Sequence, residues 1–505
     1  MPDNTPATPV APASPFAPRP ALDSLADARL ADRHRLLIGG RWVDGGAGSR
    51  PVLDPATGAP LTEVAAATAA QVDAAVAAAR AAQPGWAGLA GAERAKHLFR
   101  LARLVQEHAR ELTLLEAANT GRPAADVKAN DVAGAAQLLF HYAGWADKLR
   151  HAVPGARVAE PAARGVAALL LPWDAPLLTF ARTAGPALAA GNTVVAKPAA
   201  TTPLSVLRLA EIARRAGLPD GVLNVLTDGA PEGVGPDLAG HAGVDVVSFT
   251  GSTAVGRTVA ALAARTGART VLDLGDQAPH LLFDDAPLDE AVEAVVGAAF
   301  TGRGRPRGAI GRLLVQEPVL DEVVERLRAR IARLRLGAPL DRNADLGPLH
   351  SAAQAARVAE LVATAGAEGA EVWTAPEHGE RLAELRAEGG EYAGGFWQAP
   401  VLVTGVTQAH AVAATELRAP VLPVLTFRTP AEGVEKANNT PFGGAAAVWS
   451  AKGAQALWAA RRLRAGTVWV NEADAVDAAA PHHVGRQSGS GRAGGHHGLE
   501  AYLDV

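Results

Sequence analysis

Apolar residues between positions 70 and 118 recur at the spacing of a helix. Val72, Ala75, Val76 and Ala79 occupy positions i, i+3, i+4 and i+7, and the same spacing returns over residues 98–105. The segment ANTGRP (118–123) contains a glycine and a proline, which predict the end of this helical region. A further helix is predicted over residues 140–150.

Beyond residue 165, apolar runs alternate with helical segments. The run VAALLL (166–171) is apolar throughout, which is typical of a strand buried on both faces. Further strands are predicted at 192–198, 223–227 and 245–249, and helices at 180–190, 204–216 and 254–265. This alternation predicts a parallel, doubly wound sheet with right-handed crossovers.

A second alternating region begins near residue 271 and continues past residue 466. Its predicted helices and strands are 288–299, 312–316, 320–334, 420–427, 445–450 and 467–471. Two short strands around glycine turns are also predicted within residues 36–46, and a strand-like segment lies at 500–505. The fold class predicted from these patterns is α/β.

The chain has 505 residues, of which 49% are hydrophobic and 20% are charged. This length predicts two or three domains, and the composition suffices for large apolar cores. The formal net charge of −4 gives no electrostatic reason to expect nucleic acid or an anionic membrane as a partner. No apolar run approaches the ~20 residues that span a bilayer, so we expect a cytoplasmic protein.

The first 33 residues are rich in proline and alanine. Prolines recurring from Pro2 to Pro20 interrupt the continuous apolar helix that a signal peptide needs, and Asp3 disagrees with a transit peptide. We therefore expect residues 1–33 to form a disordered tail.

The sequence contains no cysteine. Its absence excludes a disulfide framework and any metal site built on thiolates. It is neutral about the compartment, because a protein without cysteine is stable in either redox environment.

A strand, a glycine turn and a helix start follow one another in VSFTGSTAVG (247–256). Gly251 and Gly256 allow a ligand to approach the backbone closely, and Ser252 offers a hydroxyl at the helix N-terminus. This arrangement suits a pyrophosphate. Since such a turn also occurs for structural reasons alone, the interpretation depends on the neighbouring motifs.

Four other segments accompany this turn: PWDAP (172–176), GNTVVAKPAATTPLS (191–205), GLPDGVLNV (217–225) and ELRAPV (416–421). Together they resemble the aldehyde dehydrogenase superfamily, over roughly residues 35–505. The resemblance implies a Rossmann-like cofactor domain, an α/β catalytic domain and a small β oligomerisation domain. It also implies NAD or NADP as cofactor and a homodimer or homotetramer.

The resemblance assigns cofactor-binding roles to several residues. Lys197 matches a lysine that hydrogen-bonds the adenosine ribose, and Glu416 matches an acid that binds the nicotinamide ribose. Trp173 marks the strand end that lines the cofactor cleft, although core packing would explain it equally well. The acid expected three positions after the lysine is Ala200 here, which leaves the choice between NAD and NADP open.

In the resembled family a cysteine thiolate attacks the aldehyde. The segment that should carry the thiol reads GRGRPRGAIGR (302–312), and Arg307 stands at the position of the nucleophile. A guanidinium is not a nucleophile and stays protonated at ordinary pH. Shifting the alignment by one or two residues places Pro306, Gly308 or Ala309 there, and none of these is a nucleophile either.

Four more positions depart from the family pattern. Asp174 replaces an amide that donates to the developing oxyanion, and a carboxylate would repel that charge. Asp273 replaces the general-base glutamate with a shorter acid, Asp276 replaces a glycine, and Arg418 replaces the aromatic residue against the nicotinamide ring. We expect Arg307 to pair with at least one of these acids and to fill the space of an aldehyde.

Two histidine pairs, His482–His483 and His496–His497, flank the glycine-rich C-terminal segment. Four imidazoles would bind a metal if they converged, but we favour solvated loop residues.

The predicted domain organisation follows the resemblance. Residues 34–146 and 166–275 are expected to form the dinucleotide-binding domain, and residues 276–480 the catalytic-type domain. Residues 147–165 and 481–505 are expected to form the oligomerisation elements.

Three functions are consistent with these residues. The leading hypothesis is a pseudoenzyme of this fold that lacks thiol-dependent oxidation and acts as a dinucleotide-binding protein, a scaffold or a subunit for a protein partner. The alternative is an active NAD(P)-dependent dehydrogenase in which a hydrated aldehyde gives up hydride directly, with Asp273 as base. The least favoured is a metal-dependent hydrolase built on Asp174, Asp273 and Asp276. Losing covalent catalysis and oxyanion stabilisation together favours the first hypothesis.

Overall fold

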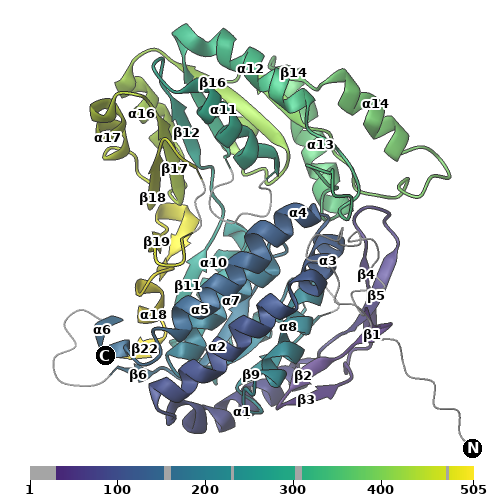
Figure 1. The fold of residues 1–505 in the computed structure, drawn as a ribbon, viewed down its shortest axis with the longest axis vertical. Coiled ribbons are helices and arrows are strands. Elements are labelled where there is room, and N and C mark those ends of the chain that lie inside the picture. The colour runs from purple at the N-terminus through teal and green to yellow at the C-terminus, as the bar shows by residue number, and fades with distance from the viewer. Residues whose placement is uncertain (1–29, 153–160, 229–232, 302–309, 474–476, 505) are drawn as a thin grey trace, which may run out of the picture.

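The computed structural model describes residues 30–152, 161–228, 233–301, 310–473 and 477–504. It shows two lobes stacked along the long axis (Figure 1). The expected tail falls outside the described residues except for its last four positions, where β1 already begins at Arg33. Among the described residues, no helix combines the length and the apolar character needed to cross a membrane.

The lower lobe contains an eight-stranded sheet with the order β20-β11-β10-β7-β8-β9-β2-β3. Its strands are β2 (Leu36–Ile38), β3 (Arg41–Val43), β7 (Val166–Leu170), β8 (Thr193–Lys197), β9 (Leu223–Val225), β10 (Val246–Thr250), β11 (Arg269–Asp273) and β20 (Gly489–Ser490). Strands β7 to β11 are mutually parallel, and every residue of β7 and β10 is buried. The apolar runs therefore predicted these central strands correctly.

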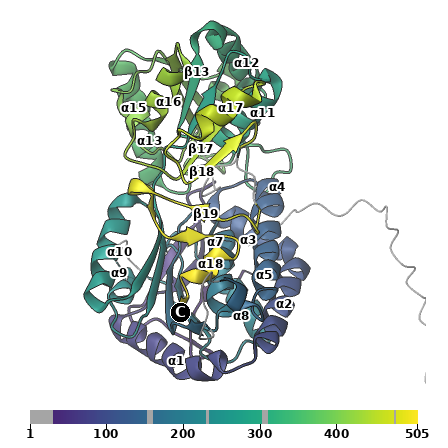
Figure 2. The ribbon, with the colours of Figure 1, turned by 90° about the vertical axis from the view of Figure 1, so that its left-hand side faces the viewer.

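Helices cover both faces of this sheet, with α9 and α10 on one side and α2, α5 and α8 on the other (Figure 2). The helices are α1 (Ala69–Ala87), α2 (Gly91–Glu107), α3 (Ala109–Thr120), α4 (Ala124–Asp126), α5 (Ala133–Ala143), α6 (Leu149–Ala152), α7 (Pro176–Ala189), α8 (Leu204–Arg215), α9 (Gly235–Ala239) and α10 (Thr253–Thr266). The region 70–118 is thus three helices.

The helix predicted over 140–150 is wrong in extent. Helix α5 ends at Ala143, and Gly144 and Trp145 follow it in turns whose amides bond to the carbonyls of Phe140 and Tyr142. Apolar spacing alone does not reveal such a break.

The upper lobe contains a seven-stranded sheet with the order β14-β15-β16-β13-β12-β17-β18. Its strands are β12 (Pro279–Leu282), β13 (Arg312–Gln316), β14 (Glu371–Trp373), β15 (Val401–Thr404), β16 (Val421–Phe427), β17 (Ala445–Trp449) and β18 (Thr467–Val470). All neighbours are parallel except β14 and β15. The α/β class with a second α/β lobe is confirmed.

Seven α-helices among the described residues of this lobe accompany the sheet. They are α11 (Leu288–Val296), α12 (Leu320–Ala332), α13 (Ala352–Ala367), α14 (Pro376–Leu385), α15 (Ala411–Ala414), α16 (Pro430–Asn438) and α17 (Gly453–Ala460).

The C-terminal segment leaves the upper lobe and runs down the lower lobe, drawn in yellow in Figure 1. It contains β19 (His482–His483), β20, β21 (Arg492–Ala493), α18 (His497–Glu500) and β22 (Leu503–Asp504). Strand β20 pairs with β11, and β22 pairs with β6 (Ala162–Ala163). A small sheet of β1 (Arg33–His34), β5 (Pro60–Ala65) and β4 (Ser49–Leu53) completes the lower lobe.

Candidate functional site

Two of the predicted acids lie at the carboxyl ends of parallel strands in the lower sheet. Asp174 follows β7 and is 1% exposed, and Asp273 is the last residue of β11. Ala175 has a φ of +50°, a left-handed conformation that turns the chain sharply before α7 starts at Pro176. Ligands of doubly wound sheets generally bind at this edge. The catalytic positions assigned to Asp174 and Asp273 stay predictions.

Arg418 connects this edge to the upper lobe. Its guanidinium forms one ion pair with Asp174 and another with Glu416, whose Oε1 lies 2.6 Å from Nε. Its backbone has a φ of +40°, and its carbonyl accepts a 2.6 Å hydrogen bond from the Gln354 amide. Both the side chain and the backbone of Arg418 are therefore held in place.

Burial and charge act in opposite directions on this pair. Burial lowers the pKa of Arg418, but the Asp174 and Glu416 carboxylates outweigh burial and hold that pKa above its usual range. Burial raises the pKa of Asp174, and Arg418 opposes the rise. The ion pair with Arg418 thus offsets part of the free energy that it costs to bury the Asp174 carboxylate.

Asp273 and Asp276 have partners other than Arg418. Asp273 pairs with Arg182 of α7, at 3.4 Å. Asp276 accepts hydrogen bonds from the Gly444 amide at 3.2 Å and the Ala445 amide at 2.7 Å. Burial raises the pKa of Asp276. Asp276 therefore anchors the start of β17, a role that the sequence did not indicate.

Trp173 makes a contact between the two lobes. Its ring is stacked on His350, with 3.7 Å between ring centroids and an interplanar angle of 6°. The His350 Nδ1 lies 2.7 Å from Gln354 Oε1, and burial lowers the pKa of His350 to about 4. Because Gln354 also bonds to Arg418, the stacked pair and the ion pairs form one connected junction.

Sequence reasoning missed a second buried group of charges beside this junction. Glu116 is fully buried and accepts a 3.1 Å hydrogen bond from the Leu177 amide at the start of α7. Arg122 pairs with Asp131 and, at 2.5 Å, with Asp126. Burial and then the nearby Asp131 charge raise the pKa of Glu116. The available signal was an acid inside an otherwise apolar helical stretch.

The glycine turn lies where it was predicted, between β10 and α10. Ser252 caps α10, its hydroxyl oxygen accepting a 3.4 Å hydrogen bond from the Val255 amide. Gly256 lies against Leu274, which a side chain at this position would overlap. The free amides of the first turn of α10, next to Gly251, suit an anionic phosphate.

Lys197 ends β8 and lies 3.0 Å from Asp228, an acid that sequence reasoning did not consider. Ala200 lies in the turn that follows β8 and offers no side-chain polar group. Lys197 and the α10 turn therefore lie at the same carboxyl edge of the parallel sheet, with Asp228 as an added acid.

Arg307 lies outside the described residues, so its expected pairing with an acid stays a prediction. His482 and His483 form β19, and the rings of His496 and His497 lie 3.8 Å apart. No group of three or more metal-ligating side chains converges within the described part of the chain.

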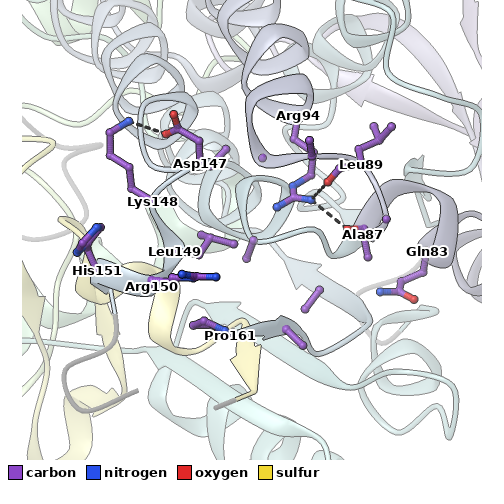
Figure 3. Close-up of a pocket in the computed structure, with 17 residues that line it drawn as sticks. Gln83, Ala87, Leu89, Arg94, Asp147, Lys148, Leu149, Arg150, His151 and Pro161 are labelled. Atoms are coloured by element: carbon purple, nitrogen blue, oxygen red, sulfur yellow. Dashed lines mark hydrogen bonds and ion pairs between the residues drawn. The ribbon is translucent and has the colours of Figure 1, made fainter. Parts of the chain in front are cut away.

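A pocket of about 640 Å³ lies away from this junction, between the α1–α2 turn and α6 (Figure 3). Its Arg94 donates to the carbonyls of Ala87 and Leu89, and its Lys148 pairs with Asp147. None of the predicted site residues lines it.

Known proteins resemble this chain over nearly its whole length. The model of the aldehyde dehydrogenase family matches residues 42–505. Retinal dehydrogenase 2 from Homo sapiens is 36% identical over 485 residues, covering 93% of this chain and 90% of that protein. PnpE in complex with nicotinamide adenine dinucleotide is 34% identical, with a TM-score of 0.87, covering 93% and 96% of the two chains. Betaine aldehyde dehydrogenase from Staphylococcus aureus in complex with NAD+ is 29% identical, with a TM-score of 0.87, covering 95% and 96%.

Proposed function

This chain belongs to the aldehyde dehydrogenase family, and we propose that it is a member that binds a dinucleotide without oxidising aldehydes through a thiol. The observation that carries the proposal is the complete absence of cysteine from a sequence that matches the family almost from end to end. Without a thiolate no thiohemiacetal forms, and Arg307 offers no replacement nucleophile.

The junction around Arg418 supports the same conclusion. The Asp174 carboxylate, at the position of the family's oxyanion donor, accepts hydrogen bonds and donates none when ionised. It also forms an ion pair with Arg418. Asp273, at the position of the general base, lies beside the Arg182 cation. Both acids therefore lie beside a cation of this chain, which partly neutralises their charge.

NAD or NADP is the cofactor of the family, and related structures with NAD bound share this fold. When bound, the nicotinamide would supply a hydride acceptor. The residues that would hold the cofactor are Trp173, Lys197, Gly251, Ser252 and Glu416. The α10 turn and Lys197 fit the phosphate and ribose groups, whereas Glu416 is already engaged by Arg418. We therefore expect weak but measurable binding.

The alternative is an active dehydrogenase that works without cysteine, and the names of relatives such as retinal dehydrogenase 2 favour it. In that case Asp273 would accept the proton of a hydrated aldehyde, for which it must first separate from Arg182. We also propose that the chain forms a homodimer or homotetramer and that it acts together with a protein partner.

An assay of the purified chain tests the proposal directly. NAD or NADP with a panel of common aldehydes should produce no reduced cofactor above background, while calorimetry should detect dinucleotide binding. Arg307→Cys is the informative variant, and it should restore little activity because Asp174 and Asp273 remain. Saturable turnover by the unmodified chain, free of host enzymes, would establish the alternative. No heat of binding at millimolar concentration would show that the cleft has lost its cofactor.

A further inference from the structure

Lys197 and Asp228 meet at one edge of the lower sheet. Strands β8 and β9 are parallel neighbours, with Lys197 ending β8 and Asp228 following shortly after β9. Thr227 fixes the backbone before Asp228, because its hydroxyl donates to the Ala65 carbonyl at 2.6 Å and its carbonyl accepts from the Ala67 amide at 2.9 Å. These two hydrogen bonds of Thr227 therefore fix the backbone position of Asp228.

The contact between the two side chains is close and sheltered. Lys197 Nζ lies 3.0 Å from Asp228 Oδ2, and the side chains are 14% and 1% exposed. Gly233 lies directly against the carboxylate, and any side chain there would overlap it. The glycine thus leaves the room that the Asp228 carboxylate occupies.

Both oxygens of the Asp228 carboxylate are buried, and neither receives a hydrogen bond within the described part of the chain. Oδ2 has the Lys197 ammonium beside it as an ion-pair partner, whereas Oδ1 has no partner there. A buried carboxylate oxygen without a donor is costly, and such groups in native proteins are generally satisfied. A ligand hydroxyl beside Lys197 would supply the missing donor and would accept from the ammonium in return.

We propose that Asp228 and Lys197 together bind the adenosine ribose diol of a dinucleotide and that Asp228 selects NAD over NADP. This inference rests on the proposed function, since it requires a dinucleotide in the cleft. The ribose 2′-hydroxyl donates to Oδ1, whereas a 2′-phosphate carries negative charge towards a buried carboxylate and is repelled. Asp228 takes the place of the acid that is missing at Ala200, from a different strand.

The two dinucleotides differ only in the 2′-phosphate, so comparing them isolates this end of the ligand from the junction at Arg418. We expect calorimetric titration of the full chain to show NAD binding at least about tenfold more tightly than NADP. Asp228→Asn keeps the size of the side chain and removes its charge. It should reduce the ratio of the NADP dissociation constant to the NAD dissociation constant by about fivefold or more, mainly through tighter NADP binding.

Asp237→Asn is the matched control, because Asp237 is exposed on the nearby α9 and its replacement changes the net charge equally. It should leave the ratio unchanged. Asp228→Ser is a second, smaller replacement in case Asp228→Asn does not fold.

Three results would overturn the inference. Equal affinities in the unmodified chain, or a ratio that neither Asp228 variant alters, would remove the role of Asp228 while leaving dinucleotide binding intact. Failure of both dinucleotides to bind the unmodified chain would instead overturn the proposed cleft, and this inference with it.

Discussion

Replacing Arg418 with methionine should destabilise the protein markedly. The variant keeps most of the side-chain volume but leaves the Asp174 carboxylate, which is 1% exposed, without its cation. Removing one partner of a buried ion pair costs about 3–5 kcal/mol. Arg418 itself is 21% exposed, so solvent offsets part of that cost and we expect a loss of about 2–3 kcal/mol.

Urea unfolding followed by tryptophan fluorescence measures this loss. Arg428→Met is the matched control, because Arg428 is 77% exposed and pairs with Glu317, which is 44% exposed. Exposed pairs contribute about 0–1 kcal/mol. A double-mutant cycle of Arg418→Met with Asp174→Asn should give a coupling energy of about 1–3 kcal/mol.

The pH dependence provides a second readout. Burial already raises the folded-state pKa of Asp174, and removing Arg418 takes away the main opposing influence. A carboxyl group with a raised folded-state pKa favours folding when protonated and loses that contribution as pH rises through this pKa. The loss of unfolding free energy in Arg418→Met, relative to the unmodified protein, should therefore be largest at about pH 8 and should become smaller towards about pH 5. A deficit no larger than that of Arg428→Met, or a coupling energy near zero, would refute the reasoning.

Two further predictions concern other parts of the structure. Burial lowers the pKa of His350 from 6.5 to about 4, so the unfolded chain binds the extra proton between these values and stability falls as pH falls through them. Acidifying from about pH 6.5 to about pH 4 should cost the unmodified protein up to about 3 kcal/mol more than His350→Asn, by urea unfolding at each pH, and parallel losses would contradict this. Gly489→Ala should cost about 2–4 kcal/mol, because Gly489 has a φ of +125° and a Cβ there would overlap the Leu272 carbonyl of β11. For Gly453→Ala, a Cβ would meet no atom within 4 Å apart from its chain neighbours and the backbone of its own helix, so the loss of stability should be near zero in the same urea assay. Equal losses in the two variants would contradict the argument.

The class of the fold and its central strands were predictable from local patterns along the chain. Residues 166–171 and 245–249 are apolar throughout because both faces of their strands are covered, and this signal is local. The glycine turn before α10 was predictable for the same reason, since its conformational needs lie within a few residues. The lack of a thiol is also a property of the sequence alone.

The pairing of the charged side chains, in contrast, was visible only in the folded structure. The sequence placed Asp174 and Arg418 at separate positions of a motif pattern, but their ion pair joins residues 244 positions apart. The contact between Lys197 and Asp228 likewise depends on two strand ends meeting at one edge of the sheet. Spacing along the chain carries no information about such pairs, because their distance is set by how strands and lobes pack rather than by the intervening residues.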